Sequence, residues 1–492
     1  MADVSAGVLP VVVIDRDSDA PLHRQIYDGY RAAILRGDLR PGQQLPSSRT
    51  LATEIGISRF PILDAYAQLL TEGYFESRTG AGTFVSASLP DQLSSADNGA
   101  PAKEHIDARP RPLSRRSALL PQFPETPWRH GWGAFGVHQP ALDEFPFRTW
   151  GGLVARHSLS PRAGAIHHVD PLGRERFREI ISDYLRTSRG VRCDPEQIMI
   201  VSGSQQALEI ASRVLLDAGD TAWVEEPGYR LTHAVLMGAG CQMAPVPVDD
   251  EGMDVAAGIK RFPKARVAFV TPSHQYPLGV TMSASRRLQL LNWAHSAGAW
   301  IIEDDYDSEY RYGSMPIASL QGLDRNSRVI YIGTFSKVLF ASLRLGYMVV
   351  PPDLVEPFRK VRFAMDIFPP YLYQEVLTDF IKEGHFARHI RRMRLLYGVR
   401  RTALEKCIRE EFDDKVKIQG AKAGMHMAVA LPAGLHDVEI AQRAAQNRVW
   451  LWPLSTNYLG KKKRHGFILG FGSAPAEHIP HAVRRMRTAF SD

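Results

Sequence analysis

The sequence predicts a chain of two domains, a small and mainly α-helical one followed by a large α/β one. Residues 1–87 hold three helical patterns and then a glycine-bearing hairpin pattern. From about residue 128 onward, short apolar strands alternate with helical segments, which is typical of α/β proteins. Residues 88–127 are rich in proline, serine and alanine and lack hydrophobic periodicity, which indicates a linker. A length of 492 residues also favours two or three domains over one.

Composition places the chain among globular proteins and excludes few partners. Its 44% hydrophobic and 23% charged residues are ordinary values, and no apolar run approaches the ~20 residues of a membrane span. The N-terminus lacks the basic start and small-residue cleavage site of a secretory signal. The three cysteines, Cys193, Cys241 and Cys407, are scattered and without metal-ligand spacing, so we expect reduced thiols, no metal site and a cytoplasmic protein. A formal charge of +7 permits a nucleic-acid partner without requiring one.

The small domain is predicted to contain three helices and a β-hairpin. The first helix covers 21–37, the second begins near Ser47 as its N-cap, and the third lies within 57–73 with Ser58 as its N-cap. The hairpin covers 74–86, around Gly80 and Gly82. The apolar positions that define the two longer helices are Leu22, Ile26, Tyr30, Ala33 and Ile34 in the first, and Ile62, Ala65, Tyr66, Leu69 and Leu70 in the third.

Three helices, a tight turn between the second and third, and a hairpin make a winged helix-turn-helix. At LPSSRTLA, ISR and ESRTGAGTFV the segment resembles the GntR-type DNA-binding domain, over about residues 20–87. The resemblance implies double-stranded DNA as a partner. It further implies phosphate contacts from Arg49 and Arg59, hydroxyl contacts from Ser48 and Ser58, and a minor-groove approach by the wing tip at Thr79 and Gly80.

The helix that follows Ser58 departs from this family's pattern. Phe60, Pro61 and Leu63 stand where polar base-reading residues are usual, so readout would use thymine methyl groups or DNA shape. Residues 1–90 hold eight arginines, no lysine and ten acidic residues, a net charge of about −2, and DNA contact must therefore come from a few placed arginines. A helical interaction module that never meets DNA is the alternative. The arginine-rich segment 109–116 either touches phosphate or is a solvated linker.

In the large domain, polar and aromatic residues follow several predicted strands directly. The carboxyl ends of strands in an open α/β sheet meet at one crevice, so these side chains should converge. Ser204 and Gln205 open a helix, where free amides favour an anionic phosphate. The other members of the set are Tyr229, His274, Asp304, Tyr306, Thr334, Ser336 and Lys337, with Arg344 close behind.

This set supplies what pyridoxal 5′-phosphate needs from a protein. The cofactor's aldehyde forms a Schiff base with a lysine, and its pyridine nitrogen is held by a carboxylate. Its 3′-oxygen takes a phenol donor, its ring stacks on an aromatic side chain, and its phosphate binds hydroxyls and an arginine. Lys337 has no acidic neighbour in the sequence, as a deprotonated nucleophile requires. The alternatives are a structural lysine on a loop and, for EDDYDSEY, a solvated acidic turn.

From about residue 128 to the end, the chain resembles the fold-type I, aspartate aminotransferase-like enzymes. The resemblance implies that Lys337 forms the Schiff base, Asp304 faces the pyridine nitrogen, Tyr306 the 3′-oxygen and Tyr229 the ring. Ser204, Gln205, Thr334, Ser336 and Arg344 would hold the phosphate. The pair of domains, with TPSHQYPLGVTMS, IIEDDYDSEYRY and GTFSK, resembles the MocR-type transcriptional regulators, which implies a homodimer with each DNA-binding domain over the partner's large domain.

Two departures favour a regulator over an active aminotransferase. Ile468, in FILGFGS, stands where those enzymes carry the arginine that grips the substrate carboxylate, and Arg464 is a candidate replacement. Tyr276 replaces the usual asparagine before Pro-x-Gly, so His274 is a candidate to share the 3′-oxygen bond. Loss of a bidentate clamp removes substrate orientation. We therefore expect a sensor of the cofactor itself or of an amino compound. A DNA-tethered aminotransferase and a repressor with an empty pocket are the alternatives, and the sequence leaves the operator, the sign of regulation and the effector open.

Overall fold

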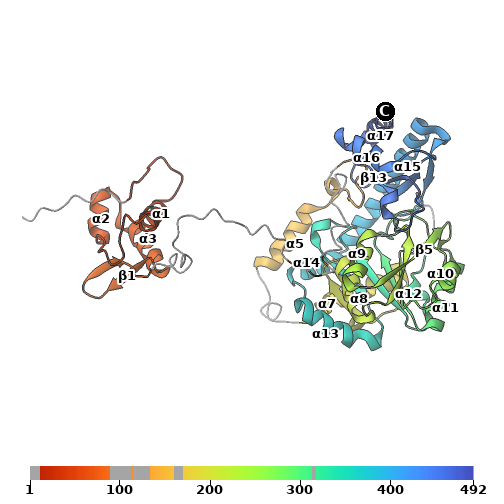
Figure 1. Cartoon of the computed structure of the whole chain (residues 1–492), viewed down its shortest axis with the longest axis horizontal. Coiled ribbons are helices and arrows are strands. Elements are labelled where there is room, and N and C mark those ends of the chain that lie inside the picture. The colour runs from red at the N-terminus through yellow and green to blue at the C-terminus, as the bar shows by residue number, and fades with distance from the viewer. Residues whose placement is uncertain are drawn as a thin grey trace, which may run out of the picture. The chain divides into compact units, whose positions relative to one another are not determined.

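The computed structural model describes residues 12–88, 112, 114, 117, 133–159, 170–312 and 317–490. The chain divides into two compact units, Met1–Arg111 and Pro112–Asp492 (Figure 1). Apart from residues 88, 112, 114 and 117, the predicted linker 88–127 lies outside the described residues. Within the described ranges, no helix is both long enough and apolar enough to cross a membrane.

The small unit has the predicted order of elements. Helices α1 (Leu22–Leu35), α2 (Ser48–Ile55) and α3 (Arg59–Thr71) are followed by strands β1 (Phe75–Arg78) and β2 (Gly82–Val85). The two strands form an antiparallel hairpin, with Phe75 opposite Val85. The prediction of a mainly α-helical domain with a wing is confirmed.

Local chemistry explains where the helices of the small unit begin. The hydroxyl of Ser47 accepts a hydrogen bond from the backbone N–H of Thr50 at 3.2 Å, as expected of an N-cap. Gly56 ends α2 with a φ of +65°, which makes the tight turn into α3. Ser58 occupies the N-cap position of α3, but its side chain makes no capping hydrogen bond.

Aromatic rings fill the core of the small unit. Tyr30, Tyr66 and Phe75 pack edge to face, with ring centroids 5.2 to 5.6 Å apart. The predicted stripe on α3 is buried except for Leu70, which is half-buried. On α1, Tyr27 is buried and Leu22 only half-buried, so the buried face is rotated from the predicted one.

The large unit is built on an eight-stranded sheet in the order β3-β10-β9-β8-β7-β4-β5-β6. Strands β9, β8, β7, β4 and β5 run parallel, β10 is antiparallel to both neighbours, and β6 pairs antiparallel with β5. In sheet order the strands are Ile198–Val201, Gly346–Val349, Val329–Thr334, Trp300–Asp305, Val267–Val270, Thr221–Glu226, Gln242–Asp249 and Gly252–Met253.

Helices cover both faces of this sheet because its strands are apolar on both sides. On β3, Ile198 and Ile200 belong to one core cluster, whereas Met199 and Val201 belong to another. The first cluster includes residues of α5 (Phe147–Leu159), α7 (Glu175–Arg189), α14 (Leu372–Lys382) and α15 (His385–Phe412). The second includes α8 (Ser204–Leu215), α9 (Arg230–Ala239) and α13 (Val355–Asp366). A third, around Trp223, holds α10 (Val255–Arg261), α11 (Ala284–Ala297) and α12 (Leu320–Leu323).

The C-terminal part forms a smaller antiparallel sheet in the order β11-β12-β14-β13. Its strands are Lys417–Gln419, His426–Ala430, Gly466–Gly470 and Trp452–Pro453. The last two helices, α16 (Asp437–Gln446) and α17 (Ile479–Thr488), pack with it and with the C-terminal part of α15 in the same core cluster. Figure 1 shows these elements together at the blue end of the chain. The predicted α/β class of the large domain is confirmed.

A buried ion pair fixes the end of β8. The carboxylate of Asp305 accepts hydrogen bonds from the Arg189 guanidinium at 2.8 Å and from the Tyr331 hydroxyl at 2.6 Å. Both members of the ion pair are at least 95% buried. Asp305→Ala is therefore expected to lower the free energy of unfolding of the large unit by about 3–5 kcal/mol, because it leaves the Arg189 charge buried and uncompensated.

Urea unfolding followed by fluorescence measures this loss, and Asp183→Ala is the matched control. The Asp183 side chain is 73% exposed in its pair with Arg186, so its removal should cost less than about 1 kcal/mol. Equal losses in the two variants would show that burial of the Asp305 pair does not matter.

Candidate functional site

A cavity lies at the carboxyl ends of the parallel strands, where the sequence predicted convergence. Eight of the described residues line it, and five of them were predicted from the sequence: Ser204, Tyr229, Asp304, Tyr306 and Lys337. The other three are His138, Thr271 and Tyr276. Tyr229, Thr271, Asp304 and Lys337 lie at or just beyond the ends of four adjacent strands, β4, β7, β8 and β9. The sheet topology thus brings together side chains that are far apart in the sequence.

Lys337 and Asp304 form the charged centre of the cavity. Burial lowers the pKa of Lys337 to about 8, since it disfavours the ammonium form more than Asp304 and Asp307 favour it. Burial also raises the pKa of Asp304 to about 7, and the neighbouring charge of Asp305 adds to this effect. Lys337 therefore presents a substantial fraction of neutral, nucleophilic amine near neutral pH.

Asp304 and Asp305 are adjacent on β8, and their side chains lie on opposite faces of the sheet. Successive side chains of a strand point to opposite faces, so Asp305 binds Arg189 while Asp304 lines the cavity. The Oδ1 atom of Asp304 is buried and has no hydrogen-bond partner among the described residues. A buried carboxylate oxygen needs a donor, and a protonated pyridine nitrogen would supply one.

The N-terminus of α8 lies at one end of the site and has the features that favour an anion. Gly203 precedes the helix with a φ of +91°, a conformation that favours glycine, and Ser204 and Gln205 open the first turn. The Arg344 guanidinium donates to the backbone carbonyl of Ser202 at 2.6 Å, next to this turn. Free helix amides beside an arginine fit a phosphate group.

The remaining predicted phosphate-binding residues, Thr334 and Ser336, are the last residue of β9 and the second residue after it. The Thr334 hydroxyl accepts from the backbone N–H of Ser336 at 3.2 Å. The Ser336 hydroxyl and the side-chain oxygen of Gln205 are buried, and neither has a hydrogen-bond partner among the described residues. These groups, together with Asp304, fit pyridoxal 5′-phosphate.

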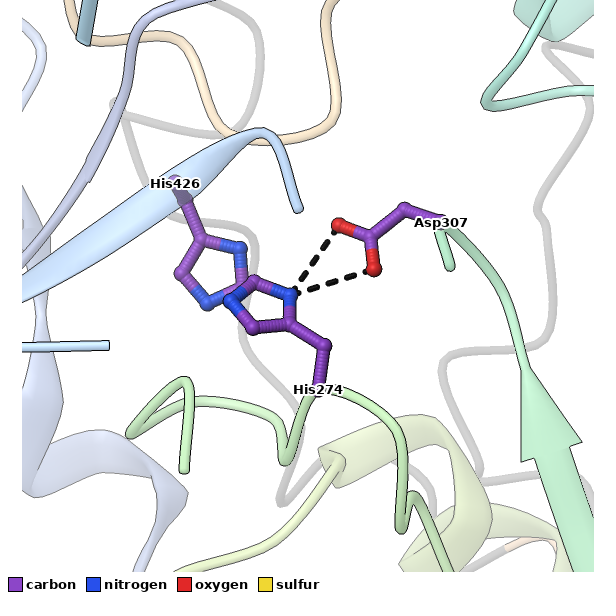
Figure 2. Close-up of side chains that lie close together, drawn as sticks. All are labelled: His274, Asp307 and His426. Carbon is purple, nitrogen blue, oxygen red and sulfur yellow. Dashed lines mark hydrogen bonds and ion pairs between the residues drawn. The ribbon is translucent and has the colours of Figure 1, made fainter. Parts of the chain in front are cut away.

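His274 lies behind Tyr306 and is not among the residues that line the cavity. The Tyr306 hydroxyl donates to the backbone carbonyl of His274 at 2.8 Å. The Nδ1 atom of His274 lies 3.1 Å from both carboxylate oxygens of Asp307. Its ring centroid is 4.5 Å from that of His426. Figure 2 shows the two imidazoles next to each other, with Asp307 at His274. His274 therefore contacts Tyr306, whose phenol is predicted to bind the cofactor's 3′-oxygen, and does not itself line the cavity.

His274, Asp307 and His426 are residue types that also bind metal ions, and their ligand atoms lie within 4.8 Å of one another. The Asp307 carboxylate is already bound, both by His274 and by the backbone N–H of Met425 at 3.1 Å. The contacts therefore describe a buried hydrogen-bonded pair beside a second imidazole.

Sequence reasoning missed His138 and His426. Burial holds the pKa of both imidazoles well below its usual range, and the Lys337 charge contributes in the same direction, so both rings are neutral. His138 lies in GVHQP and His426 in GMHMA, neither of which carries a motif for this chemistry. Asp307 lies within the motif EDDYDSEY, so its role could have been predicted from the sequence.

Neither Ile468, at the position of the missing arginine, nor Arg464, its candidate replacement, lines the cavity. Ile468 is fully buried in an apolar cluster that contains Tyr276 and Tyr306, both of which line the cavity. Arg464 is exposed, and its guanidinium donates to the Tyr458 hydroxyl at 2.9 Å. None of the described residues that line the cavity is an arginine.

The predicted DNA-binding residues lie on the surface of the small unit. Arg49, Ser58, Arg59, Thr79 and Gly80 are exposed, and Ser48 is half-buried. The Arg59 guanidinium donates to the Ser48 hydroxyl at 2.9 Å, which joins the starts of α2 and α3. On the same first turns of α3, Phe60 is 74% and Leu63 is 41% exposed.

Comparisons with known proteins match both units. The model for bacterial regulatory proteins of the gntR family matches residues 22–85, and the model for aminotransferase class I and II matches residues 165–465. The probable rhizopine catabolism regulatory protein MocR of Rhizobium meliloti is 40% identical, over 98% of this chain and 96% of its own length. The chain belongs to the MocR-type transcriptional regulators.

Two further proteins, a regulator and an aminotransferase, are similar to this MocR-type chain. The HTH-type pyridoxine biosynthesis transcriptional regulator PdxR of Corynebacterium glutamicum is 30% identical, over 95% of each chain. The α-aminoadipate aminotransferase LysN of Thermus thermophilus, solved with N-(5′-phosphopyridoxyl)-L-leucine, is 26% identical with a TM-score of 0.69. The match covers 77% of the MocR-type chain and 96% of LysN. The fold of the large unit is thus that of an aminotransferase.

The lowered pKa of Lys337 predicts how cofactor uptake depends on pH. Only the neutral amine attacks an aldehyde, and its fraction rises about tenfold per pH unit below the pKa. The rate at which the apo-protein takes up pyridoxal 5′-phosphate should therefore rise between pH 6.5 and about 8 and then level off. Stopped-flow absorbance measures this rate. A rate that keeps rising to about pH 10 would show that Lys337 titrates like an exposed lysine.

Proposed function

We propose that the chain is a transcriptional regulator whose large unit binds pyridoxal 5′-phosphate through Lys337 and whose small unit binds double-stranded DNA. Its effector is the cofactor itself or an amino compound. The observation that carries the proposal is the cavity lined by both Lys337 and Asp304, whose buried Oδ1 atom has no hydrogen-bond partner among the described residues, in a chain that also carries a GntR-type unit. When bound, the cofactor would supply an aldehyde that captures amines.

The residues of the chain would each bind one part of the cofactor. The neutral Lys337 amine would attack the aldehyde, and Asp304 would hold the pyridine nitrogen. Tyr306 would turn its hydroxyl to the 3′-oxygen, and Tyr229 would cover the ring. The first turn of α8, with Ser336, Thr334 and Arg344, would bind the phosphate.

Regulation would follow from a ligand that binds one conformation of the protein better than another. Such a ligand shifts an existing equilibrium by its difference in affinity for the two states. We propose a cytoplasmic, head-to-tail homodimer, in which that shift changes how the two small units engage an operator. The names of MocR and PdxR, both regulators, support the regulatory role.

An active aminotransferase with a DNA-binding unit is the second candidate, and the aminotransferase fold favours it. The buried, apolar position of Ile468 favours the regulator, because none of the described residues that line the cavity is an arginine that could clamp a substrate carboxylate.

Turnover separates the two candidates. The holo-protein is incubated with common amino acids and 2-oxoglutarate, and keto-acid formation is followed with time. The proposal expects no more than one equivalent of product per Lys337 site, together with operator binding that depends on cofactor or amine. Sustained multiple turnover with an ordinary amino acid would assign the chain to the enzymes.

A further inference from the structure

Helix α3 carries apolar side chains on its exposed face as well as on its buried one. The exposed residues of α2 are all polar or charged: Arg49, Thr50, Thr53 and Glu54. On α3, by contrast, Phe60 is 74% and Leu63 is 41% exposed, and Ala67 is exposed as well. These three residues are spaced at i, i+3 and i+7, so they lie along one side of the helix, which we call the outer stripe.

Positive charge and hydroxyl groups lie next to the outer stripe. Arg59 directly precedes Phe60, and its guanidinium donates to the Ser48 hydroxyl at 2.9 Å. Arg49, the residue after Ser48, is exposed on the first turn of α2. Arginines match the phosphates of a nucleic acid, and the gntR-family model covers all of α3. The charge beside the stripe therefore favours DNA over a second protein as the partner of this face.

Asp64 indicates which part of the DNA the outer stripe meets. It is exposed four residues after Phe60, so its carboxylate lies on the same side of α3. A carboxylate repels phosphate, and this side of the helix is therefore unsuited to lie along the DNA backbone. Over the base edges of the major groove it has a partner, because the amino group of cytosine can donate to it. Helix-turn-helix proteins place the N-terminal residues of their second motif helix at such edges.

From these positions we infer that the outer stripe reads the 5-methyl groups of thymines in the major groove of the operator. The inference rests on the proposed function, because it needs a small unit that binds double-stranded DNA. The major-groove edges of guanine, cytosine and adenine are polar, and the side chains of Phe60 and Leu63 would leave their donors and acceptors without partners. The thymine methyl is the apolar group that this groove displays.

Replacement of thymine by uracil tests the inference, because uracil has the same hydrogen-bonding groups and lacks only the methyl. The full-length holo-protein first selects a duplex from a random library. That duplex is then remade with each thymine in turn replaced by uracil, and fluorescence anisotropy gives the affinities. At one or more positions the wild-type protein should bind the uracil duplex about fourfold more weakly, the effect of one lost methyl contact. Equal affinities at every position would overturn the inference.

Phe60→Ala and Leu63→Ala link the methyl groups to the outer stripe. At the sensitive positions, at least one of the two variants should bind the thymine and uracil duplexes equally, because the contact is already absent. Both side chains are exposed, so the variants should fold. Leu35→Ala is the matched control: Leu35 is 46% exposed at the end of α1, and its removal should leave the fourfold preference for thymine intact. A preference that persists in both α3 variants, or that also disappears in the control, would contradict the inference.

Failure of the underlying function gives a different result. A wild-type protein that enriches no duplex from the library would overturn the DNA-binding role and the inference with it. A selected duplex that tolerates uracil at every thymine would leave the DNA-binding role intact and overturn the inference alone. If Phe60→Ala and Leu63→Ala changed the oligomeric state in sedimentation and kept the thymine preference, the outer stripe would be a protein contact and the inference would be wrong.

Discussion

Lys337→Ala is expected to abolish the covalently held cofactor completely. The amine of Lys337 lines the cavity, its pKa is lowered to about 8, and it would form the bond to the aldehyde. The phosphate-binding turn and Asp304 remain, so free cofactor would still bind, but without the absorbance of the lysine-bound form. Absorbance of the purified protein after gel filtration measures the loss.

Lys360→Ala is the matched control for this variant. Lys360 lies on α13 with its side chain 76% exposed, in an ion pair with Glu356. It should retain the full cofactor absorbance. If Lys337→Ala kept that absorbance as well, the cofactor would be bound by another lysine and the site would be misassigned.

Arg59→Ala is expected to weaken operator binding by about 10- to 100-fold. Arg59 is exposed at the start of α3, and Ser48 holds its guanidinium at 2.9 Å. A charge-assisted hydrogen bond of about 1.5–3 kcal/mol would be lost. Loss of one phosphate contact should also reduce the dependence of log affinity on log salt by about one unit. Fluorescence anisotropy with a duplex selected from a random library measures both quantities.

The control for Arg59 is Arg24, an arginine on α1 that already pairs with Asp28 at 3.2 Å. Arg24→Ala should change the operator affinity by less than about twofold, because it removes only an exposed ion pair. The cofactor absorbance should stay intact in both variants. Simultaneous loss of DNA and cofactor binding in Arg59→Ala would contradict two separable modules.

Local signals explain what the sequence could predict of the fold. The N-cap at Ser47 and the buried stripe on α3 could be predicted, because each depends on residues within a turn or two along the chain. The strands of the large sheet were predictable from short apolar runs that end in polar loops. The burial of Tyr27 in place of Leu22 depends on how α1 packs against α3, which no local pattern contains.

In the candidate site, too, some positions follow from local sequence signals and others depend on tertiary packing. Lys337, Asp304, Tyr306, Tyr229 and Ser204 each lie at or just beyond the end of a strand, and the sheet rule was enough to predict that they meet. His138 and His426 come from segments without such a rule, and their positions depend on the register of the smaller sheet and on the path of the chain before α5. The place of His274 behind Tyr306, with Asp307 at its Nδ1 atom, likewise depends on tertiary contacts.

The most direct test of the account compares operator affinity with and without cofactor in the wild-type chain and in Lys337→Ala. The account predicts that pyridoxal 5′-phosphate changes the affinity of the wild-type protein severalfold and leaves that of Lys337→Ala unchanged, under conditions where both proteins are folded. Equal operator affinities for the wild-type apo- and holo-proteins, with or without an amine, would contradict the central claim that the Lys337 site controls DNA binding.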